Sequence, residues 1–160
     1  MCPDINDVPL KADIKKSDIN MMGGLSLAFI GDSVYDLMIR GYVLSKGDAR
    51  AELLHRSAVK YANAEFQARA AEKLLPELTE DEEAVYRRGR NAHSAHTPKN
   101  KSEADYHKAT GFEALMGYLY LTGNTQRLYE LFDIILTVEK EKKENEQKKE
   151  EPFNVLAKRQ

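Results

Sequence analysis

Residues 25–40 read LSLAFIGDSVYDLMIR, and this stretch decides the fold of the chain. At about 100° per residue, apolar side chains on one side of it form a stripe typical of a helix packed into a core: Leu27, Ile30, Val34, Leu37 and Met38. The opposite side carries an aromatic ring and three charges: Phe29, Asp32, Asp36 and Arg40. A large apolar ring beside carboxylates often marks a partner surface, although a core helix with ordinary surface residues fits the periodicity equally well.

Gly31 lies inside this predicted helix, at a position where an ordinary side chain would favour the helix more. A glycine in a helix interior is about 1 kcal/mol less favourable than an alanine. We therefore expect another part of the chain to approach the backbone closely at Gly31.

The composition predicts one soluble helical domain. The chain has 160 residues, of which 42% are hydrophobic and 31% charged, and it contains no tryptophan. The net charge is −2, so nucleic-acid binding requires a local basic patch. A single cysteine, Cys2, excludes an internal disulfide and a cysteine-rich zinc site. No apolar run approaches the ~18 residues of a membrane span and no signal peptide is visible, so we expect a cytoplasmic protein that does not contact a membrane.

Breaks and capping signals divide the chain into an N-terminal arm (1–22), a helical domain (23–138) and a charged tail (139–160). We read residues 1–20 as irregular, and Gly23 and Gly24 as the break before the first helix. The first predicted helix begins after these glycines and ends at about Lys46. Four more helices are predicted, over about Ala49 to Leu75, Glu80 to Arg88, Glu103 to Leu121 and Thr125 to Val138. The second helix has Leu53, Ala58 and Phe66 among its expected core positions. Strand patterns and internal repeats are absent, which predicts an all-α helical bundle.

The segment 87–101, RRGRNAHSAHTPKNK, has no periodicity and is a long loop for a compact domain, which favours function or mobility. Its five cations either contact phosphates or are simply solvated: Arg87, Arg88, Arg90, Lys99 and Lys101. His93 and His96 lie in the same loop without a third nearby ligand, so a metal site there is the weaker interpretation. The tail begins EKEKKENEQKKEE, which either prolongs the last helix or is disordered, and from Pro152 onward we expect a loose end.

Glu113 is the second informative acid. It lies within GFEALMGYLYL (111–121), on the flank of an apolar stripe. An ionised carboxylate half embedded among apolar groups is unfavourable unless it is paired or bound to a metal. A salt bridge to a neighbouring cation is one explanation. The other is Mg²⁺, which two carboxylates from different helices can hold and which can activate a water for attack on a phosphodiester.

The run AFIGDSVYD (28–36), followed by FEALMG (112–117), resembles the signature and the second acidic motif of the ribonuclease III catalytic-domain family. The resemblance covers residues 25–136, and the basic loop together with GYLYLTG (117–123) resembles the Mini-III subgroup. It implies an all-helical, homodimeric endonuclease that cleaves double-stranded RNA with Mg²⁺, for which Mn²⁺ can substitute, and leaves 5′-phosphate ends. The subgroup is associated with maturing the ends of 23S-type ribosomal RNA.

The resemblance also implies roles for single residues. Asp32 matches the signature aspartate and Glu113 the essential glutamate, both as metal ligands, with Asp36 as a further candidate ligand. Phe29 matches the aromatic side chain that inserts into the partner subunit. The family has carboxylates where this chain has Ala28 and Thr110, and another where it has Leu25, so the metal shell is thinner here. No double-stranded RNA-binding domain is recognised after Leu136, which leaves the basic loop to hold the duplex.

Two other functions remain open at this stage. A non-catalytic module that binds double-stranded RNA or the ribosome on the same fold is compatible with Ala28 and Thr110, but the presence of Asp32 and Glu113 argues against it. A helical adaptor acting through the Phe29 face and the tail explains neither the half-embedded carboxylate nor the basic loop.

Overall fold

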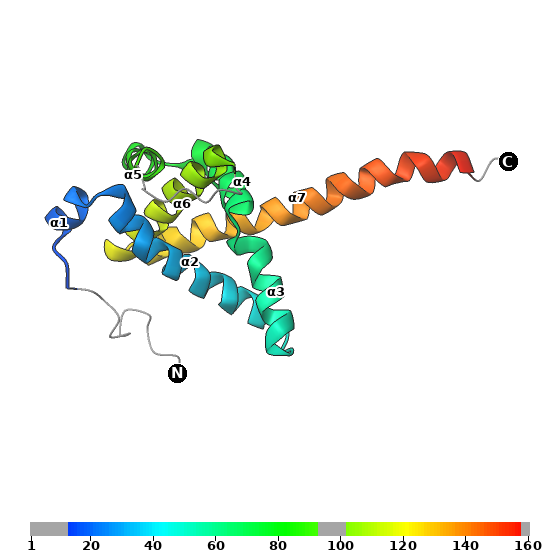
Figure 1. Cartoon of the computed structure of the whole chain (residues 1–160), viewed down its shortest axis with the longest axis horizontal. Helices are drawn as coiled ribbons and strands as arrows, with labels where there is room; N and C mark the ends of the chain where they lie inside the picture. Colours follow the sequence, from blue (N-terminus) through cyan, green and yellow to red (C-terminus); the bar gives the residue numbers. More distant parts are fainter. Residues whose placement is uncertain (1–12, 93–101, 158–160) are drawn as a thin grey trace.

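The computed structural model describes residues 13–92 and 102–157, and within these ranges the secondary structure is entirely helical, as predicted (Figure 1). In this described part of the chain, seven α-helices and one 3₁₀ turn follow one another: α1 (Lys16–Met21), α2 (Gly24–Ser45), α3 (Ala51–Ala62), α4 (Ala64–Leu74), η2 (Leu75–Glu77), α5 (Glu80–Arg90), α6 (Glu103–Leu121) and α7 (Thr125–Ala157). Lys99, Lys101, His93 and His96 lie outside the described residues.

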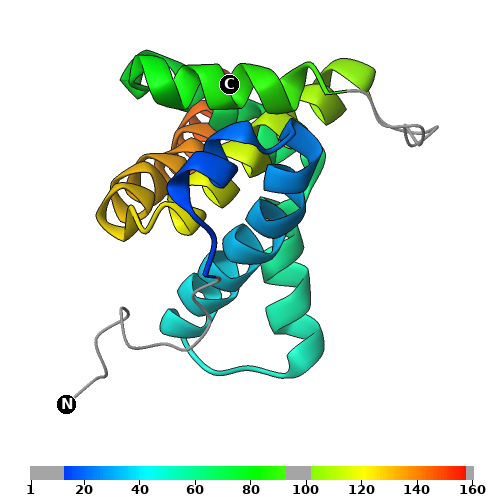
Figure 2. The same cartoon turned by 90° about the vertical axis from the view of Figure 1, so that its left-hand side faces the viewer.

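Helix α6 is the centre of the bundle, and it packs against α2, α4 and α5. Its side chains Phe112, Leu115, Met116 and Leu119 are fully buried. The ring of Phe112 meets Tyr35 of α2 edge-on at 4.8 Å between centroids. The first part of α7 closes the core with Leu131 and Ile135. In the view of Figure 2, α5 lies at one end of the bundle and the connection between α2 and α3 at the other.

The buried stripe of α2 differs from the prediction. The buried residues are Gly24, Leu27, Ala28, Gly31, Tyr35, Ile39 and Val43, whereas Leu37 is 67% exposed. Apolar residues occur around most of this helix, so periodicity alone did not locate the centre of the buried side. The outward position of Phe29 and Asp32 is nevertheless confirmed.

The predicted helix from Ala49 to Leu75 is two helices, because Asn63 caps both of them. Its backbone is extended (φ −80°, ψ 154°), and its side-chain oxygen accepts a hydrogen bond from the Phe66 N–H at 2.9 Å, which starts α4. Its amide nitrogen donates to the carbonyls of Val59 and Lys60 at 3.1 and 3.0 Å, which satisfies acceptors at the end of α3. The expected core residue Leu53 is 48% exposed.

The N-terminal arm is not irregular throughout, because residues 16–21 form α1. Ile19 of this helix is 1% exposed and packs with Leu27, Ala28 and neighbouring apolar groups of α5 and α6. Nη1 of Arg88 in α5 donates to the carbonyls of Asn20 (2.6 Å) and Met22 (3.0 Å), which holds the α1–α2 connection on the bundle.

Glu82 joins the start of α5 to α7. It forms the predicted capping box with Thr79, and both carboxylate oxygens accept hydrogen bonds from Arg127 at 2.8 and 3.0 Å. Burial alone would raise the pKa of Glu82, but the hydrogen bonds from Arg127 and Thr79 outweigh it and hold that pKa below its ordinary value.

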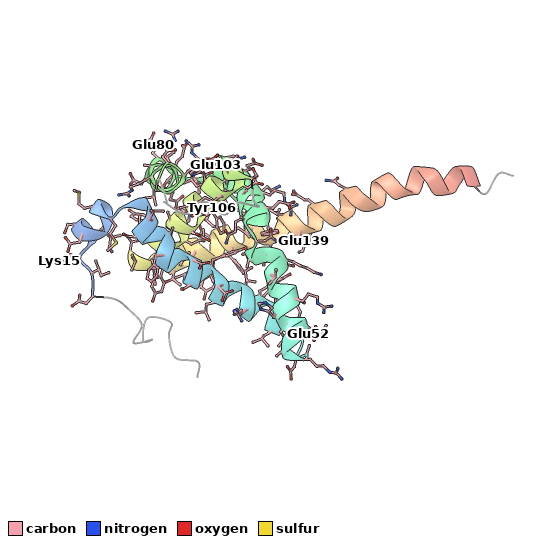
Figure 3. All side chains as sticks on the ribbon, viewed as in Figure 1. Lys15, Glu52, Glu80, Glu103, Tyr106 and Glu139 are labelled. Carbon is pink, nitrogen blue, oxygen red and sulfur yellow. The ribbon has the colours of Figure 1, made fainter. Side chains whose placement is uncertain are left out.

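Helix α6 has the predicted bounds, and α7 is longer than the packed segment predicted. The Glu/Lys block prolongs α7, which includes Pro152 and ends at Ala157, so the loose end expected after Pro152 is helical up to that residue. Figure 1 shows α7 leaving the other helices, and Figure 3 labels Glu139 close to that point. Among the described residues, no helix combines the length and the apolarity that crossing a membrane requires.

Candidate active site at the crossing of two helices

Helices α2 and α6 touch through their backbones at two glycines. A Cβ atom on Gly31 would lie 1.7 Å from the carbonyl oxygen of Glu113 and 2.7 Å from the Gly117 nitrogen. A Cβ atom on Gly117 would lie 2.0 Å from the carbonyl oxygen of Leu27. The close approach predicted at Gly31 is therefore confirmed, and we call this contact the α2–α6 crossing.

The crossing brings the two sequence-predicted acids onto adjacent helical turns. Asp32 directly follows Gly31 on α2 and is exposed, while Glu113, whose carbonyl faces Gly31, is half-buried on α6. A ligand from solvent can thus reach Asp32 on the turn of α2 that touches the turn of α6 bearing Glu113. This pair is the core of the candidate site.

Asp36 does not join this pair. It lies one turn after Asp32, and its Oδ2 accepts a hydrogen bond from Nε of Arg40 at 2.5 Å within the same helix. In the described part of the chain, no three His, Cys, Asp or Glu side chains are grouped closely enough to hold one metal ion. The structure therefore gives no support to the third ligand considered from the sequence.

The two positions where the family has carboxylates are packed rather than open. Ala28 is 6% exposed and lies in the apolar cluster around Ile19. Thr110 is also 6% exposed, and its hydroxyl donates to the carbonyl of Tyr106 at 3.0 Å within α6. Both residues fill the interior beside the site and supply no charge.

The donor set suits a hydrated magnesium ion. Mg²⁺ prefers oxygen ligands, keeps several waters, and is commonly held by one or two carboxylates together with substrate phosphates. Asp32 and Glu113 match this requirement, one of them open to solvent. The arrangement can accommodate a divalent cation that still has free positions for water and phosphate.

The last turn of α5 packs against α6 near the site. A Cβ atom on Gly89 would lie 2.5 Å from the Ala114 side chain and 2.9 Å from the Thr110 carbonyl oxygen. Helix α5 extends to Arg90, so the loop that the sequence predicted from residue 87 begins only after Arg90. Its first residues after α5 start close to the helical turn that bears Glu113.

The three described cations of the predicted RNA-binding set have different environments. Arg87 pairs with Glu83 on the surface, and Arg90 is exposed, with its guanidinium 5.9 Å from the Tyr86 ring centroid. Arg88 instead uses Nη1 for the two carbonyls of the α1–α2 connection. Sequence reasoning missed this anchoring role, and no signal in the sequence distinguishes Arg88 from its neighbours.

Gly117 and Gly89 were also missed as residues that shape the site. Gly117 lies inside a helix that was predicted, so the argument that predicted a close approach at Gly31 applied to it as well. Gly89 was assigned to the loop after Arg88, and only the extension of α5 to Arg90 places it inside a helix.

A row of apolar side chains is exposed along α2. Phe29 is 83% exposed, and Leu25, Leu37 and Leu44 are exposed by 41%, 67% and 54%. We call these four residues the α2 apolar row. A soluble chain rarely leaves so many large apolar groups on one helix uncovered unless another molecule covers them.

Comparisons with known proteins place the fold in a family. A model of the ribonuclease III domain matches residues 25–124. The chain is 46% identical over 116 residues to the Mini-ribonuclease 3 of Streptococcus pneumoniae, covering 71% of this chain and 91% of the relative. The Mini-ribonuclease 3 of Clostridium tetani is 38% identical over 138 residues, covering 86% and 91%. The crystal structure of a Fusobacterium nucleatum protein superposes with a TM-score of 0.68 at 29% identity, covering 76% of this chain and 98% of that one.

Proposed function

Because this chain belongs to the ribonuclease III family, and within it to the Mini-III endoribonucleases, we propose that it hydrolyses double-stranded RNA with Mg²⁺ held by Asp32 and Glu113. The observation that carries this proposal is the α2–α6 crossing, which brings these two acids onto touching helices. We further propose that the natural substrate is the paired ends of 23S-type ribosomal RNA precursors, and that the protein works in the cytoplasm.

The chain's own residues do three things in this mechanism. Asp32 and Glu113 would hold the cation, which when bound would polarise the scissile phosphodiester and activate a water for in-line attack. Because Asp32 is exposed, a phosphate can approach the cation from solvent. The backbone contact at Gly31 fixes the distance between the two helices, so the carboxylates keep their spacing before the duplex arrives.

The duplex is held by cations on and after the last turn of α5. We assign phosphate contacts to Arg87, Arg90, Lys99 and Lys101, and we remove Arg88 from this set because its Nη1 anchors the α1–α2 connection. The surface ion pair of Arg87 with Glu83 contributes about 0–1 kcal/mol, so exchanging it for a phosphate carries little penalty. A-form RNA is recognised mainly by its shape and phosphates, which suits such a surface.

We propose a homodimer in which the α2 apolar row is covered by the same row of a second copy. A two-fold interface uses one patch twice, and a row along a single long helix can pack against its own copy in the antiparallel direction. Phe29 is the most exposed member and the expected anchor. Replacing Phe29 with alanine should shift the protein to a monomer in sedimentation velocity, whereas a wild-type monomer at high micromolar concentration would refute the dimer.

The experiment that tests the activity uses a long RNA duplex with the wild-type chain, Asp32→Asn and Glu113→Gln, over a Mg²⁺ titration. Both substitutions keep the side-chain shape and remove the charge that holds the cation, so cleavage should disappear while duplex binding persists. Asp36→Asn is the matched control, because Asp36 lies on the same helix but is paired with Arg40, and it should cleave like the wild type. Full turnover by either of the first two variants would remove that acid from the mechanism.

One observation keeps a second function in view. Ala28 and Thr110 are buried and uncharged, at two positions where the family resemblance leads us to expect carboxylates. A non-catalytic RNA-binding module on this fold would also lack metal-binding carboxylates. The same assay separates the two functions, because such a module binds the duplex and leaves both strands intact at every Mg²⁺ concentration. Comparing a duplex from 23S-type precursor ends with one of unrelated sequence then tests the substrate.

A further inference from the structure

We propose that the cavity between the end of α2, α3 and α7 binds one nucleotide, with its base against two tyrosine rings and its phosphate between two lysines. The cavity has a volume of about 390 Å³, which lies within the ~300–1,000 Å³ range of small-molecule sites. Figure 3 labels Glu139, which α7 contributes to the lining. The nucleotide is either free in solution or an unpaired unit of an RNA strand, and only the second source rests on the proposed function.

The cavity is separate from the candidate active site. Tyr42 in its lining follows Asp32 by ten residues along α2, which corresponds to about 15 Å of helix. Gly47 and Ala49 of the α2–α3 connection also line it, and this connection lies at the end of the bundle away from α5 (Figure 2). Among the described residues, none that we assign to metal or phosphate contacts in the proposed function lines this cavity.

A second copy on the α2 apolar row would leave the cavity open. Tyr42 and Leu44 are two residues apart, or about 200° around the helix axis, so the cavity and the row lie on opposite sides of α2. The rim residues Lys46 and Lys60 are exposed, and Leu53 is 48% exposed. A ligand can therefore enter from solvent.

The floor of the cavity is aromatic. Tyr42 and Tyr61 meet edge-on, with 5.8 Å between their centroids, and Phe132 and Phe66 in turn contact these two rings edge-on. This packing fixes both tyrosines, and nucleobases stack readily on aromatic side chains. Burial, Tyr42 and Glu139 raise the pKa of Tyr61 to about 12, so its phenol keeps its proton and can donate a hydrogen bond to the ligand.

The rim carries the charge that a phosphate requires. Lys46 and Lys60 both line the cavity, and neither forms an ion pair with a carboxylate in the described part of the chain. Nζ of Lys46 instead lies 4.8 Å from the centroid of the Tyr42 ring, as a cation–π contact. A phosphate offers this ammonium group charge-assisted hydrogen bonds, which would draw it off the ring and expose the ring face to a base.

Glu139 decides between classes of ligand. It is the one carboxylate among the described lining residues, and its charge opposes an acidic peptide or a bare anion in the cavity. The amino group of adenine, cytosine or guanine can instead donate a hydrogen bond to it. A nucleotide thus matches the lysines, the tyrosines and Glu139 together, whereas an acidic peptide matches the lysines alone.

The first test titrates the full chain with adenosine 5′-monophosphate in a calorimeter. Lys46→Gln and Lys60→Gln should each bind the nucleotide at least about fivefold more weakly, the loss expected for one charge-assisted contact. Lys140→Gln is the matched control, because Lys140 is exposed beside Glu139 on α7 and does not line the cavity. Equal losses in all three variants would reduce the binding to a general attraction between charges and overturn the site. Inorganic phosphate that binds as tightly as the nucleotide would also overturn it, because the base would then contribute nothing.

A second titration distinguishes the two sources of the nucleotide. Fluorescence anisotropy compares a blunt RNA duplex with the same duplex carrying a single-stranded adenosine extension, without divalent cations so that the RNA stays intact. If the cavity takes an RNA unit, the extension raises the affinity of the wild type but not of Lys46→Gln. If it takes free nucleotides, adenosine 5′-monophosphate binds and the extension changes nothing. If neither probe binds in a way that depends on Lys46, the inference is refuted.

The failure of this inference and the failure of the proposed function are distinguishable. Lys46→Gln and Lys60→Gln should cleave a blunt duplex at the wild-type rate, because both residues lie outside the candidate active site. Cleavage by a chain whose cavity binds no nucleotide would refute the cavity site and leave the nuclease function intact. Nucleotide binding by a chain that cuts no duplex would support the cavity site and refute the nuclease function.

Discussion

Replacing Gly31 with alanine tests whether the α2–α6 crossing positions the two acids. The new Cβ would lie 1.7 Å from the Glu113 carbonyl oxygen, and real Cβ contacts essentially never fall below 3.0 Å, so the helices must separate by at least 1.3 Å. The obstructing atoms are backbone, so no side-chain rotation relieves the clash. Overpacking of this kind costs about 1–3 kcal/mol or more, against a helix-propensity gain of about 1 kcal/mol. The difference is a net loss of about 0–2 kcal/mol in the free energy of unfolding, and we expect its upper end, about 2 kcal/mol, because the blocking atoms are backbone.

The effect on catalysis should exceed the effect on stability. A misplacement of about 1 Å in a catalytic group can lower a rate about 100-fold. The assays are urea unfolding, followed by circular dichroism, and single-turnover cleavage of an RNA duplex under conditions where the variant is fully folded. Both measurements use the same preparation, so a fall in rate cannot be assigned to unfolded protein.

Gly41→Ala is the matched control. Gly41 lies on the same helix, and nothing is within 4 Å of a Cβ atom built there, so the substitution should stabilise the chain by about 1 kcal/mol and leave the cleavage rate unchanged. If Gly31→Ala unfolds at the urea concentration of the wild type and cleaves at the wild-type rate, the crossing does not set the spacing of Asp32 and Glu113.

Four further outcomes follow from the contacts described above. Asn63→Ala should lower the free energy of unfolding by about 1–2 kcal/mol, because one side chain caps two helices, and urea unfolding measures this. Glu82→Gln should lower the free energy of unfolding by about 2–3 kcal/mol at neutral pH. Because the pKa of Glu82 is lowered in the folded state, its carboxylate stabilises the fold fully above the unfolded pKa near 4.3, and this stabilisation disappears as the pH falls through the folded pKa. The stabilities of variant and wild type should therefore converge in acid unfolding titrations. Arg88→Gln removes the charge and should weaken the hold on the α1–α2 connection, seen as faster amide exchange there. The salt dependence of RNA binding should stay unchanged, whereas the loss of a phosphate contact would lower its slope by about 1. A chain ending at Lys140 should fold and cleave normally, since the lost ion pair between Lys73 and Glu141 is exposed, and lost activity would show that the tail contacts substrate.

The helix boundaries that the sequence predicts well are those with explicit capping chemistry. Ser102 accepts the Asp105 N–H and starts α6 where predicted, and Thr79 with Glu82 forms the capping box of α5. Asn63 was harder to interpret, because asparagine inside an alanine-rich pattern is compatible with a continuous helix. The structure shows what the pattern does not: the Asn63 side chain caps both helices, and Phe66 at the start of α4 is buried in the core.

The placement of the two candidate acids was predictable and their surroundings were not, while their role as metal ligands stays a prediction. Asp32, Glu113 and the close approach at Gly31 follow from spacing, from the glycine and from the family resemblance. The pairing of Asp36 with Arg40 and the anchoring by Arg88 depend on which rotamer each side chain adopts once the helices have packed. An exposed carboxylate or guanidinium group usually has several oppositely charged or polar groups nearby along the chain. The tertiary structure decides which of these groups becomes its hydrogen-bond partner.

The glycine contacts explain how a site with few ligands can still be organised. Contacts between backbones, at Gly31, Gly117 and Gly89, cannot relax by changing a rotamer, so they hold α2, α5 and α6 at fixed spacings. A carboxylate shell that is complete in the protein tolerates some movement, because the metal pulls its ligands into place. A shell of two carboxylates has no such reserve, and the helices must already stand at the right distance when the phosphate arrives. We therefore expect the crossing glycines to be as sensitive to substitution as the acids, although a glycine has no side chain with which to hold a metal ion.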